Sequence, residues 1–274
     1  MAELDVSVVI PTFRREKLVV EAISSALTQR GVSLEVIVVD DSGEASARDA
    51  VSAIGDPRVR YVARLKPGGC PAYPRNEGAA LARGRYLHFL DDDDLLEHGA
   101  LTALVCALDV RPNAGMAFGT ITPFGENADE LRLHQQYYGE ATRIARSIRS
   151  NRELVAKLVF QGTILVNSAC MVRRNVFLAS GGYDSTMPIA EDVDLWGRVA
   201  RLSGGHVFVD QPIMRYRTGS PSIMHGTNMR EKLMSSYRRI HDKYRATNGT
   251  FDFLMMKVWA RTLLRRRETQ GGVP

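Results

Sequence analysis

Four consecutive carboxylates, residues 91–94, end an apolar run in the stretch LHFLDDDDLL, residues 87–96. Adjacent like charges repel one another, and capping of a following helix would need only one of them. Hard cations such as Mg²⁺ and Mn²⁺ bind carboxylate oxygens, usually one or two together with substrate phosphates. The cluster therefore favours a divalent metal site, and a solvated capping loop is the alternative.

A second acidic group consists of Glu191 and Asp192, which follow Gly181, Gly182 and Tyr183 and a loop containing proline. These acids introduce a helix predicted over residues 193–201. Capping and favourable interaction with the helix dipole would also explain them. The residues alone leave both interpretations open.

Composition is that of an ordinary globular protein, with 274 residues, 45% hydrophobic, 24% charged and a net charge of +5. That charge is too small to indicate a nucleic-acid partner. The three cysteines form no CxxC pair, which argues against zinc and suits a reducing compartment. No signal peptide or bilayer-spanning segment is recognised, so we expect a cytoplasmic protein, either soluble or at the inner face of the plasma membrane.

Strands and helices alternate in the first third of the chain, which predicts a parallel sheet covered on both faces. The expected strands cover residues 6–10, 34–39, 59–63 and 86–90. The expected helices cover residues 17–29, 45–54 and 76–82, with a loop rich in glycine and proline at 64–74.

The remainder of the chain shows a looser pattern. Helices are expected at 100–110, 143–160, 193–201, 228–244 and 251–267. Extended segments are expected at 116–121, 168–172, 206–209 and 213–216. Residues 123–138 are polar and predict an irregular, mobile loop.

Three groups of polar residues follow predicted strands: Pro11 to Phe13 after the first, Asp40 and Asp41 after the second, and residues 91–94 after the fourth. The carboxyl ends of parallel strands meet at one edge of the sheet, where ligands bind. Both GxGxxG and GxxxxGK[ST] are absent, so carboxylates holding a metal are the available means of binding phosphate. The alternatives are a proline that only ends a strand and an Asx-turn at Asp40 and Asp41.

Four motifs occur in the order typical of one family: SVVIPTFRRE, EVIVVDDSG, RNEGAALARGRYLHFLDDDDLL and GGYD…AEDVDLW. Together they resemble family 2 glycosyltransferases over residues 7–217, although the usual FLDSDD is FLDDDD here. The resemblance implies an α/β GT-A fold, with a Rossmann-like, mostly parallel central sheet flanked by helices. It places a nucleotide-sugar half at 1–95, an acceptor half at 96–220 and a helical C-terminal extension at 221–274.

The resemblance also implies residue roles at the nucleotide-sugar site. Pro11, Thr12, Phe13 and Arg14 match the beginning of the nucleotide pocket. Asp41 matches the carboxylate that contacts the base, typically uracil, and Arg75 matches a residue near the diphosphate. Asp91 and Asp93 match the DxD acids, with Asp93 as the main metal ligand. Asp92 matches a contact to ribose or to a water on the metal.

Further roles concern the acceptor side and the metal. Asp192 matches the catalytic base, with Glu191 beside it. Trp196 matches an aromatic residue beside the acceptor, and a core position is the alternative. His225 matches a late metal ligand in some GT-A enzymes, and an exposed loop histidine is the alternative.

The implied activity is inverting transfer of a sugar from a nucleotide diphosphate donor, typically a UDP-sugar, with Mn²⁺ or Mg²⁺. The implied acceptor is a hydroxyl of a glycan or lipid-linked sugar in bacterial polysaccharide or glycoconjugate synthesis. QxxRW is absent, which argues against a processive synthase. Two alternatives remain: a sugar nucleotidyltransferase, although PTFRRE lacks that class's glycines, and a degenerate, non-catalytic binding module.

The C-terminal stretch places Phe251, Leu254 and Val258 at helical spacing, with Lys257 and Arg261 nearby. A basic amphipathic helix can lie on an anionic membrane, so peripheral membrane contact is one interpretation. A helix packed on the domain or a homodimer interface is the other.

Overall fold

An eight-stranded sheet forms the centre of the computed structural model, which describes residues 4–162, 164–219 and 228–270, with side chains up to residue 262. The strands are β1 Val6–Thr12, β2 Leu34–Asp40, β3 Val59–Ala63, β4 Tyr86–Phe89, β5 Leu95–Leu96, β6 Ala114–Phe124, β7 Cys170–Arg173 and β8 Gly205–Arg217. Their order across the sheet is β3-β2-β1-β4-β7-β6-β8-β5.

The first half of the sheet is parallel, as predicted, because β1 pairs with both β2 and β4, and β2 pairs with β3. The strand β7 then runs antiparallel between β4 and β6, and β6 and β8 are again parallel to each other. The short β5 lies antiparallel to β8 at the edge. The predicted mostly parallel sheet is therefore confirmed. The extended segment expected at 168–172 corresponds to β7, but its antiparallel direction and the short antiparallel β5 were not predicted.

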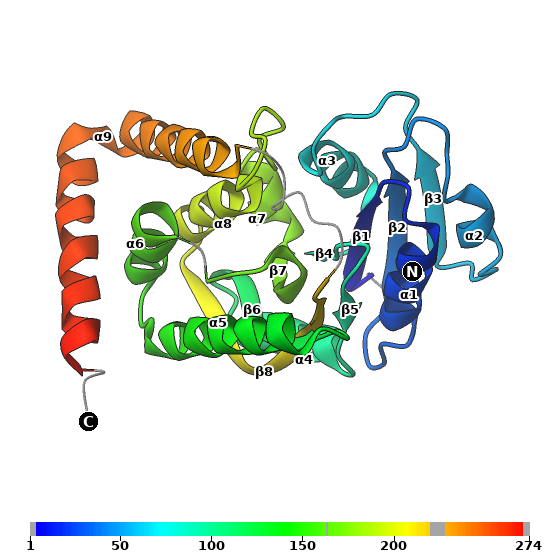
Figure 1. Ribbon diagram of the computed structural model, residues 1–274, viewed down its shortest axis with the longest axis horizontal. Coiled ribbons are helices and arrows are strands. Elements are labelled where there is room, and N and C mark those ends of the chain that lie inside the picture. Colours follow the sequence, from blue (N-terminus) through cyan, green and yellow to red (C-terminus); the bar gives the residue numbers. More distant parts are fainter. Residues whose placement is uncertain (1–3, 163, 220–227, 271–274) are drawn as a thin grey trace.

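Helices cover both faces of this sheet (Figure 1). They are α1 Glu16–Leu27, α2 Arg48–Ser52, α3 Ala72–Leu81, α4 Ala100–Val110, α5 Ala128–Ser147, α6 Asn151–Gln161, α7 Arg174–Ala179, α8 Glu191–Leu202 and α9 Met229–Gln270. Alternate side chains of β1 separate the two cores. Val8 and Ile10 are buried with α1 and α4, whereas Val9 is buried on the other face with α3.

The prediction of an irregular loop at 123–138 was wrong, because most of that segment belongs to α5. Asn127 caps this helix, and its side chain accepts hydrogen bonds from the backbone N–H of Asp129 at 3.0 Å and of Glu130 at 3.2 Å. Of the helix's 20 residues, three are buried, Tyr138, Ala141 and Ala145. A helix so exposed has a polar composition that is easily mistaken for that of a loop.

Other boundaries also differ from the predictions. The helix expected at 143–160 is interrupted at 148–150, where the Ser150 hydroxyl caps α6 by accepting from Glu153 N at 3.3 Å. The helix α3 begins at Ala72, inside the expected loop, and β8 is one strand with irregular register instead of two. Neither β5 nor α7 was predicted.

Two terminal helices were predicted, and α9 consists of two helical segments separated at Gly249, whose φ of 85° is left-handed. The second segment packs on α6, with Phe253, Met256 and Ala260 buried in the shared core. Across the described residues, no helix combines enough length with enough hydrophobicity to pass through a bilayer.

Candidate active site

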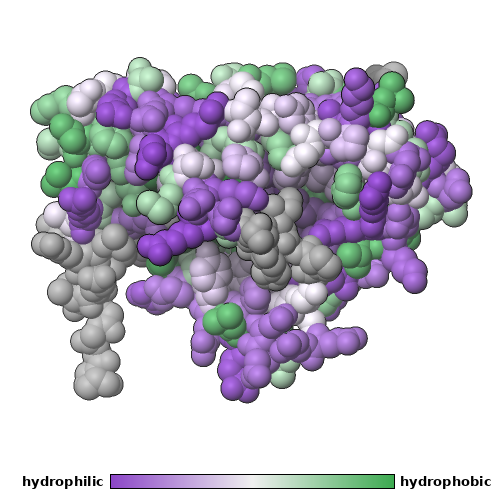
Figure 2. Space-filling model, turned by 45° about the horizontal axis from the view of Figure 1, so that its top comes forward, coloured by the Kyte–Doolittle hydropathy of each residue, from purple (hydrophilic) through white to green (hydrophobic). Residues whose placement is uncertain are grey.

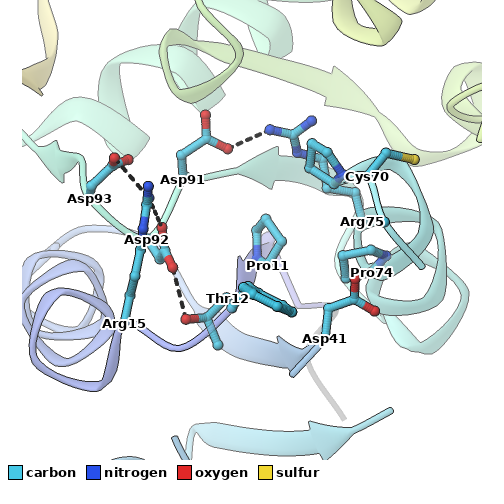
Figure 3. A pocket seen from close by; sticks show the side chains of 13 residues that line it. Pro11, Thr12, Arg15, Asp41, Cys70, Pro74, Arg75, Asp91, Asp92 and Asp93 are labelled. Carbon is cyan, nitrogen blue, oxygen red and sulfur yellow. Dashed lines mark hydrogen bonds and ion pairs between the residues drawn. The ribbon is translucent and has the colours of Figure 1, made fainter. Parts of the chain in front are cut away.

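A cleft of about 380 Å³ opens at the carboxyl ends of β1, β2 and β4 (Figure 3). All three polar strand ends noted in the sequence contribute to it, together with the start of α3. The lining residues are Pro11, Thr12, Phe13, Arg15, Asp41, Gly69, Cys70, Pro71, Pro74, Arg75, Asp91, Asp92 and Asp93.

Arg15, which immediately precedes α1, connects two of the aspartates in this cleft. Its Nη1 lies 2.9 Å from Asp92 Oδ1 and 2.9 Å from Asp93 Oδ2. The Thr12 hydroxyl donates to Asp92 Oδ2 at 2.8 Å. Burial raises the pKa of Asp92 to about 6 although Arg15 opposes this, and burial also raises the pKa of Asp93. Asp92 is thus an anchored, nearly buried group, whereas Asp93 keeps a partly exposed carboxylate.

Asp94 points away from the cleft and has a structural role. It is buried, and its Oδ2 accepts a hydrogen bond from the Ser168 hydroxyl at 2.8 Å. The same hydroxyl accepts from the backbone N–H of Asp91 at 3.0 Å, and Arg217 N donates to Asp94 Oδ1 at 3.3 Å. Burial and the neighbouring carboxylates raise the pKa of Asp94 well above its usual range. The fourth acid therefore holds the acidic loop against β8, which explains why the run is four residues long.

Arg75 joins the acidic loop to the beginning of α8. It lies on α3, and its two Nη atoms are each 2.6 Å from a carboxylate oxygen, one on Asp91 and one on Glu191. Burial alone would lower the pKa of Arg75, but the surrounding negative groups raise it well above the usual value. A permanently charged guanidinium therefore balances two carboxylates and brings both acidic groups of the sequence to one site.

Asp192, next to Glu191, has the properties expected of a general base. Burial and the charge of Glu191 raise its pKa to about 7, and Arg75 partly opposes them. Its carboxylate accepts a hydrogen bond from Val193 N at 2.8 Å and forms no ion pair with the residues that the structure describes. A carboxylate with a pKa near neutrality can accept a proton during a reaction.

Tyr137 of α5 lies near this carboxylate and is 51% exposed. Partial burial and the Asp192 charge both raise the pKa of its phenol. The ring packs edge-on against Tyr138, with centroids 5.2 Å apart, and Tyr138 in turn contacts Tyr216 of β8. One partly exposed ring, that of Tyr137, therefore lies close enough to Asp192 to be influenced by its charge, and the buried Tyr138 supports that ring.

The two acids at the carboxyl end of β2, Asp40 within the strand and Asp41 just after it, have different environments. Asp40 accepts from Ser42 N at 2.9 Å, Ala47 N at 2.9 Å and the Tyr61 hydroxyl at 2.7 Å. Those bonds form the turn that the sequence offered as an alternative. Asp41 lines the cleft, pairs with Arg64 and accepts from Gly68 N at 2.9 Å.

Some sequence candidates lie elsewhere. Arg14 is exposed, pairs with Glu44 at 2.9 Å and does not line the cleft, where the structure places Arg15 instead. Trp196 is fully buried, which corresponds to the core position that the sequence left open. His225 lies outside the described residues.

Sequence reasoning did not identify Arg15, Arg64 or Ser168 as parts of this site. The pair of arginines after PTF was a signal for Arg15, but it did not indicate which of the two faces the cleft. That choice follows from the backbone, because Arg14 is left-handed with a φ of 53°. No local pattern indicated Ser168.

Two carboxylates in the cleft could hold a divalent cation. The side chains of Asp91 and Asp93 are 30% and 20% exposed. Within the described part of the chain, no three His, Cys, Asp or Glu side chains are grouped so as to bind a metal by themselves. Mg²⁺ and Mn²⁺ commonly take one or two carboxylates and complete their coordination with substrate phosphates. The donor set therefore fits a cation that binds together with a phosphorylated ligand.

The sequence matches the family model described as glycosyl transferase family 2 over residues 7–179. Glycosyltransferase GlyG of Streptococcus pneumoniae is 32% identical over 229 residues, which cover 82% of this chain and 74% of that protein. The GalNAc(5)-diNAcBac-PP-undecaprenol beta-1,3-glucosyltransferase of Campylobacter jejuni is 36% identical over 171 residues, 59% of this chain. The succinoglycan biosynthesis protein ExoO of Rhizobium meliloti is 41% identical over 132 residues, 48% of this chain. The chain spans 53% and 37%, respectively, of the length of these last two relatives.

Solved structures of S. aureus TarS share the fold. The TarS 1–349 complex with UDP-GlcNAc superposes with a TM-score of 0.63 at 14% identity, covering 94% of this chain and 79% of that one. The complex with UDP gives a TM-score of 0.60 at 16% identity, covering 90% and 74%. This similarity confirms the predicted GT-A-like fold.

Proposed function

Because the chain belongs to glycosyl transferase family 2, we propose that it transfers a sugar from a nucleotide diphosphate donor to an acceptor hydroxyl, with inversion at the anomeric carbon. The observation that carries this proposal is the bridge formed by Arg75. It links Asp91, in the acidic loop, to Glu191, the neighbour of Asp192. The bridge holds a cleft suited to a diphosphate beside a carboxylate suited to accept a proton.

We assign the nucleotide to the part of the cleft between Phe13 and Asp41, with UDP as the preferred nucleotide. Phe13 is 47% exposed and can cover a base, and the carboxylate of Asp41 can accept its N–H group. The similarity to TarS, whose structures include UDP and UDP-GlcNAc, supports this choice. Arg64 would then keep Asp41 in place.

The diphosphate would lie against the acidic loop, where Asp91 and Asp93 would hold Mn²⁺ or Mg²⁺. A bound divalent cation would supply Lewis-acid stabilisation of the departing diphosphate. Arg15 is already in this region, 2.9 Å from Asp93, and its guanidinium adds a fixed positive charge beside the leaving group. Asp92, hydrogen-bonded to Thr12 and Arg15, keeps the loop in position.

Asp192 would accept the proton of the acceptor hydroxyl. That oxygen attacks the anomeric carbon from the face opposite the diphosphate, the bond between carbon and phosphate oxygen breaks, and the nucleoside diphosphate leaves with the electron pair. A single displacement of this kind inverts the anomeric configuration and needs no covalent intermediate. Tyr137, beside Asp192, would support the acceptor.

The acceptor is proposed to be a glycan or a lipid-linked sugar of a cell-surface polysaccharide. The names of two relatives support this class, since one concerns succinoglycan biosynthesis and the other an undecaprenol-linked glycan. An acceptor that is itself a sugar also suits the exposed ring of Tyr137, because the apolar face of a sugar can pack on an aromatic ring.

The test is calorimetric titration of UDP, GDP and dTDP with and without Mn²⁺. We expect one nucleotide, UDP, to bind in a metal-dependent way, and Asp93→Ala to abolish that dependence. Asp129→Ala, which removes an exposed acid from the first turn of α5, is the matched control and should bind as the wild type does. Absence of binding for all three nucleotides would contradict the proposal and favour a non-catalytic module. Diphosphate release from a nucleoside triphosphate and a sugar phosphate would instead indicate a nucleotidyltransferase.

A further inference from the structure

The second segment of α9 presents an apolar stripe to solvent. Phe251, Leu254, Met255 and Val258 are 79%, 53%, 49% and 58% exposed. Their spacing of three and four residues places them on one side of the helix. Figure 2 shows hydrophobic residues gathered at the left edge of the view, where α9 lies. Because α9 packs on the domain through a separate set of buried side chains, packing within the fold does not account for this exposed stripe.

The opposite side of the same segment is the one that packs on the protein. Phe253, Met256 and Ala260 are buried against α6. The helix position is therefore determined by its inner side, and the outer stripe is held in a fixed orientation with no described side chain covering it.

Cations border the stripe on both sides. On one flank, Lys257 Nζ lies 5.8 Å from the Phe253 ring centroid, and Arg261 is exposed one turn further on. On the other flank, the exposed Arg152 of α6 lies over the Trp259 ring at 5.1 Å. The single acid between residues 251 and 262, Asp252, accepts a hydrogen bond from the Tyr244 hydroxyl at 2.7 Å. The rim of the stripe is therefore positively charged.

We propose that this stripe docks the protein on an anionic lipid surface. A helix that lies in the interface inserts its apolar side among the acyl chains and places lysine and arginine at the headgroups. The half-buried Trp259 suits the same level, where tryptophan is enriched. A two-fold dimer through this stripe would bring the cationic rims of the two copies together. Charge complementarity therefore favours anionic lipid over a second copy.

The test is cosedimentation of the full chain with vesicles of phosphatidylcholine alone or mixed with phosphatidylglycerol, without donor or acceptor. The result is thus independent of the proposed function. We expect binding to the anionic vesicles only, weakened by salt. Leu254→Ser with Val258→Ser should reduce that binding at least about ten-fold. Lys257→Gln with Arg261→Gln should reduce it on the order of five-fold for each charge.

A matched control replaces a valine and a leucine on other helices that are at least as exposed, Val110→Ser with Leu202→Ser, and should bind like the wild type. Circular dichroism would verify that each variant is folded. Equal binding of the wild type and the stripe variant, or no binding of the wild type to anionic vesicles, would overturn the proposal. The proposal would also be overturned if, in sedimentation velocity, the wild type were a dimer and the stripe variant a monomer.

Discussion

Arg75 and Glu191 are separated by 116 residues in the chain, and their side chains meet at 2.6 Å inside the protein. The other Nη of Arg75 is equally close to Asp91. A buried carboxylate is costly unless a charge of opposite sign lies beside it. One guanidinium therefore stabilises acids from both halves of the chain. It also affects Asp192, whose pKa is raised by burial and Glu191 and lowered by Arg75.

Glu191→Gln should move the pH dependence of activity. Removing the charge of Glu191 leaves burial as the main influence that raises the pKa of Asp192, so that pKa falls below about 7. A base must be ionised, so the fall in kcat/KM on the acid side should begin at a lower pH than in the wild type. Urea unfolding should also show a loss of about 3 kcal/mol, because Arg75 loses a charged partner. An acid limb that stays in place or moves to higher pH would contradict the proposed coupling.

Asp192→Asn should lower kcat by about 10²- to 10⁴-fold, because an amide cannot accept the acceptor's proton. Affinity for the nucleotide should not change, since Asp192 does not line the nucleotide cleft. In the wild type, activity should rise with pH with a midpoint near 7, where half of the Asp192 carboxylates are ionised. Asp210→Asn, at an exposed acid paired with Arg146, is the control. Unchanged turnover in Asp192→Asn would eliminate this residue as the base.

Tyr137→Ala should raise the KM for the acceptor by about ten-fold and leave the KM for the donor unchanged. The ring is half exposed beside Asp192, and its loss removes contact area for a sugar. Tyr137→Phe keeps the ring and should retain a KM near the wild-type value. Initial rates at varied acceptor and fixed, saturating donor would measure this. Equal effects of the two substitutions would mean that the hydroxyl, and not the ring, is responsible.

The sequence predicted the parallel half of the sheet well because its strands are locally encoded. Runs of β-branched residues at 6–10 and 34–39 predict buried strands, and the structure has both strands. Once parallel neighbours are inferred, convergence of Asp41 and residues 91–93 follows from geometry. An extended segment was expected at the position of β7, but its antiparallel pairing with β4 has no local signal, since it joins residues more than eighty positions apart.

The finer structure of the site depends on tertiary contacts that no local pattern reveals. Both Arg14 and Arg15 are charged residues beside the same strand, and a single left-handed residue decides which one faces the aspartates. Four successive acids look equivalent in sequence, yet a hydrogen bond from Ser168, in a distant segment, holds the Asp94 side chain away from the cleft. Likewise, the polar composition of α5 concealed the helix that carries Tyr137 to Asp192.

Gly78→Ala should destabilise the protein although alanine favours helices. Gly78 lies on α3 where the helix meets the sheet, and a Cβ there would clash with Val9 Cγ1 and lie 3.3 Å from Val39 Cγ2. Both valines belong to neighbouring buried strands, so α3 must shift, and such overpacking costs about 1–3 kcal/mol. Because Arg75 lies one turn earlier on α3, nucleotide affinity should fall as well.

Gly139→Ala is the matched control, since Gly139 also lies inside a helix, but a Cβ there would contact nothing within 4 Å. That substitution should raise the free energy of unfolding by roughly 0.5–1 kcal/mol through helix propensity alone. Urea unfolding of both variants would measure the two changes under identical conditions. Changes of opposite sign in the free energy of unfolding would show that contact with β1 and β2 requires glycine at position 78. Stabilisation in both variants would contradict the close contact between α3 and these strands.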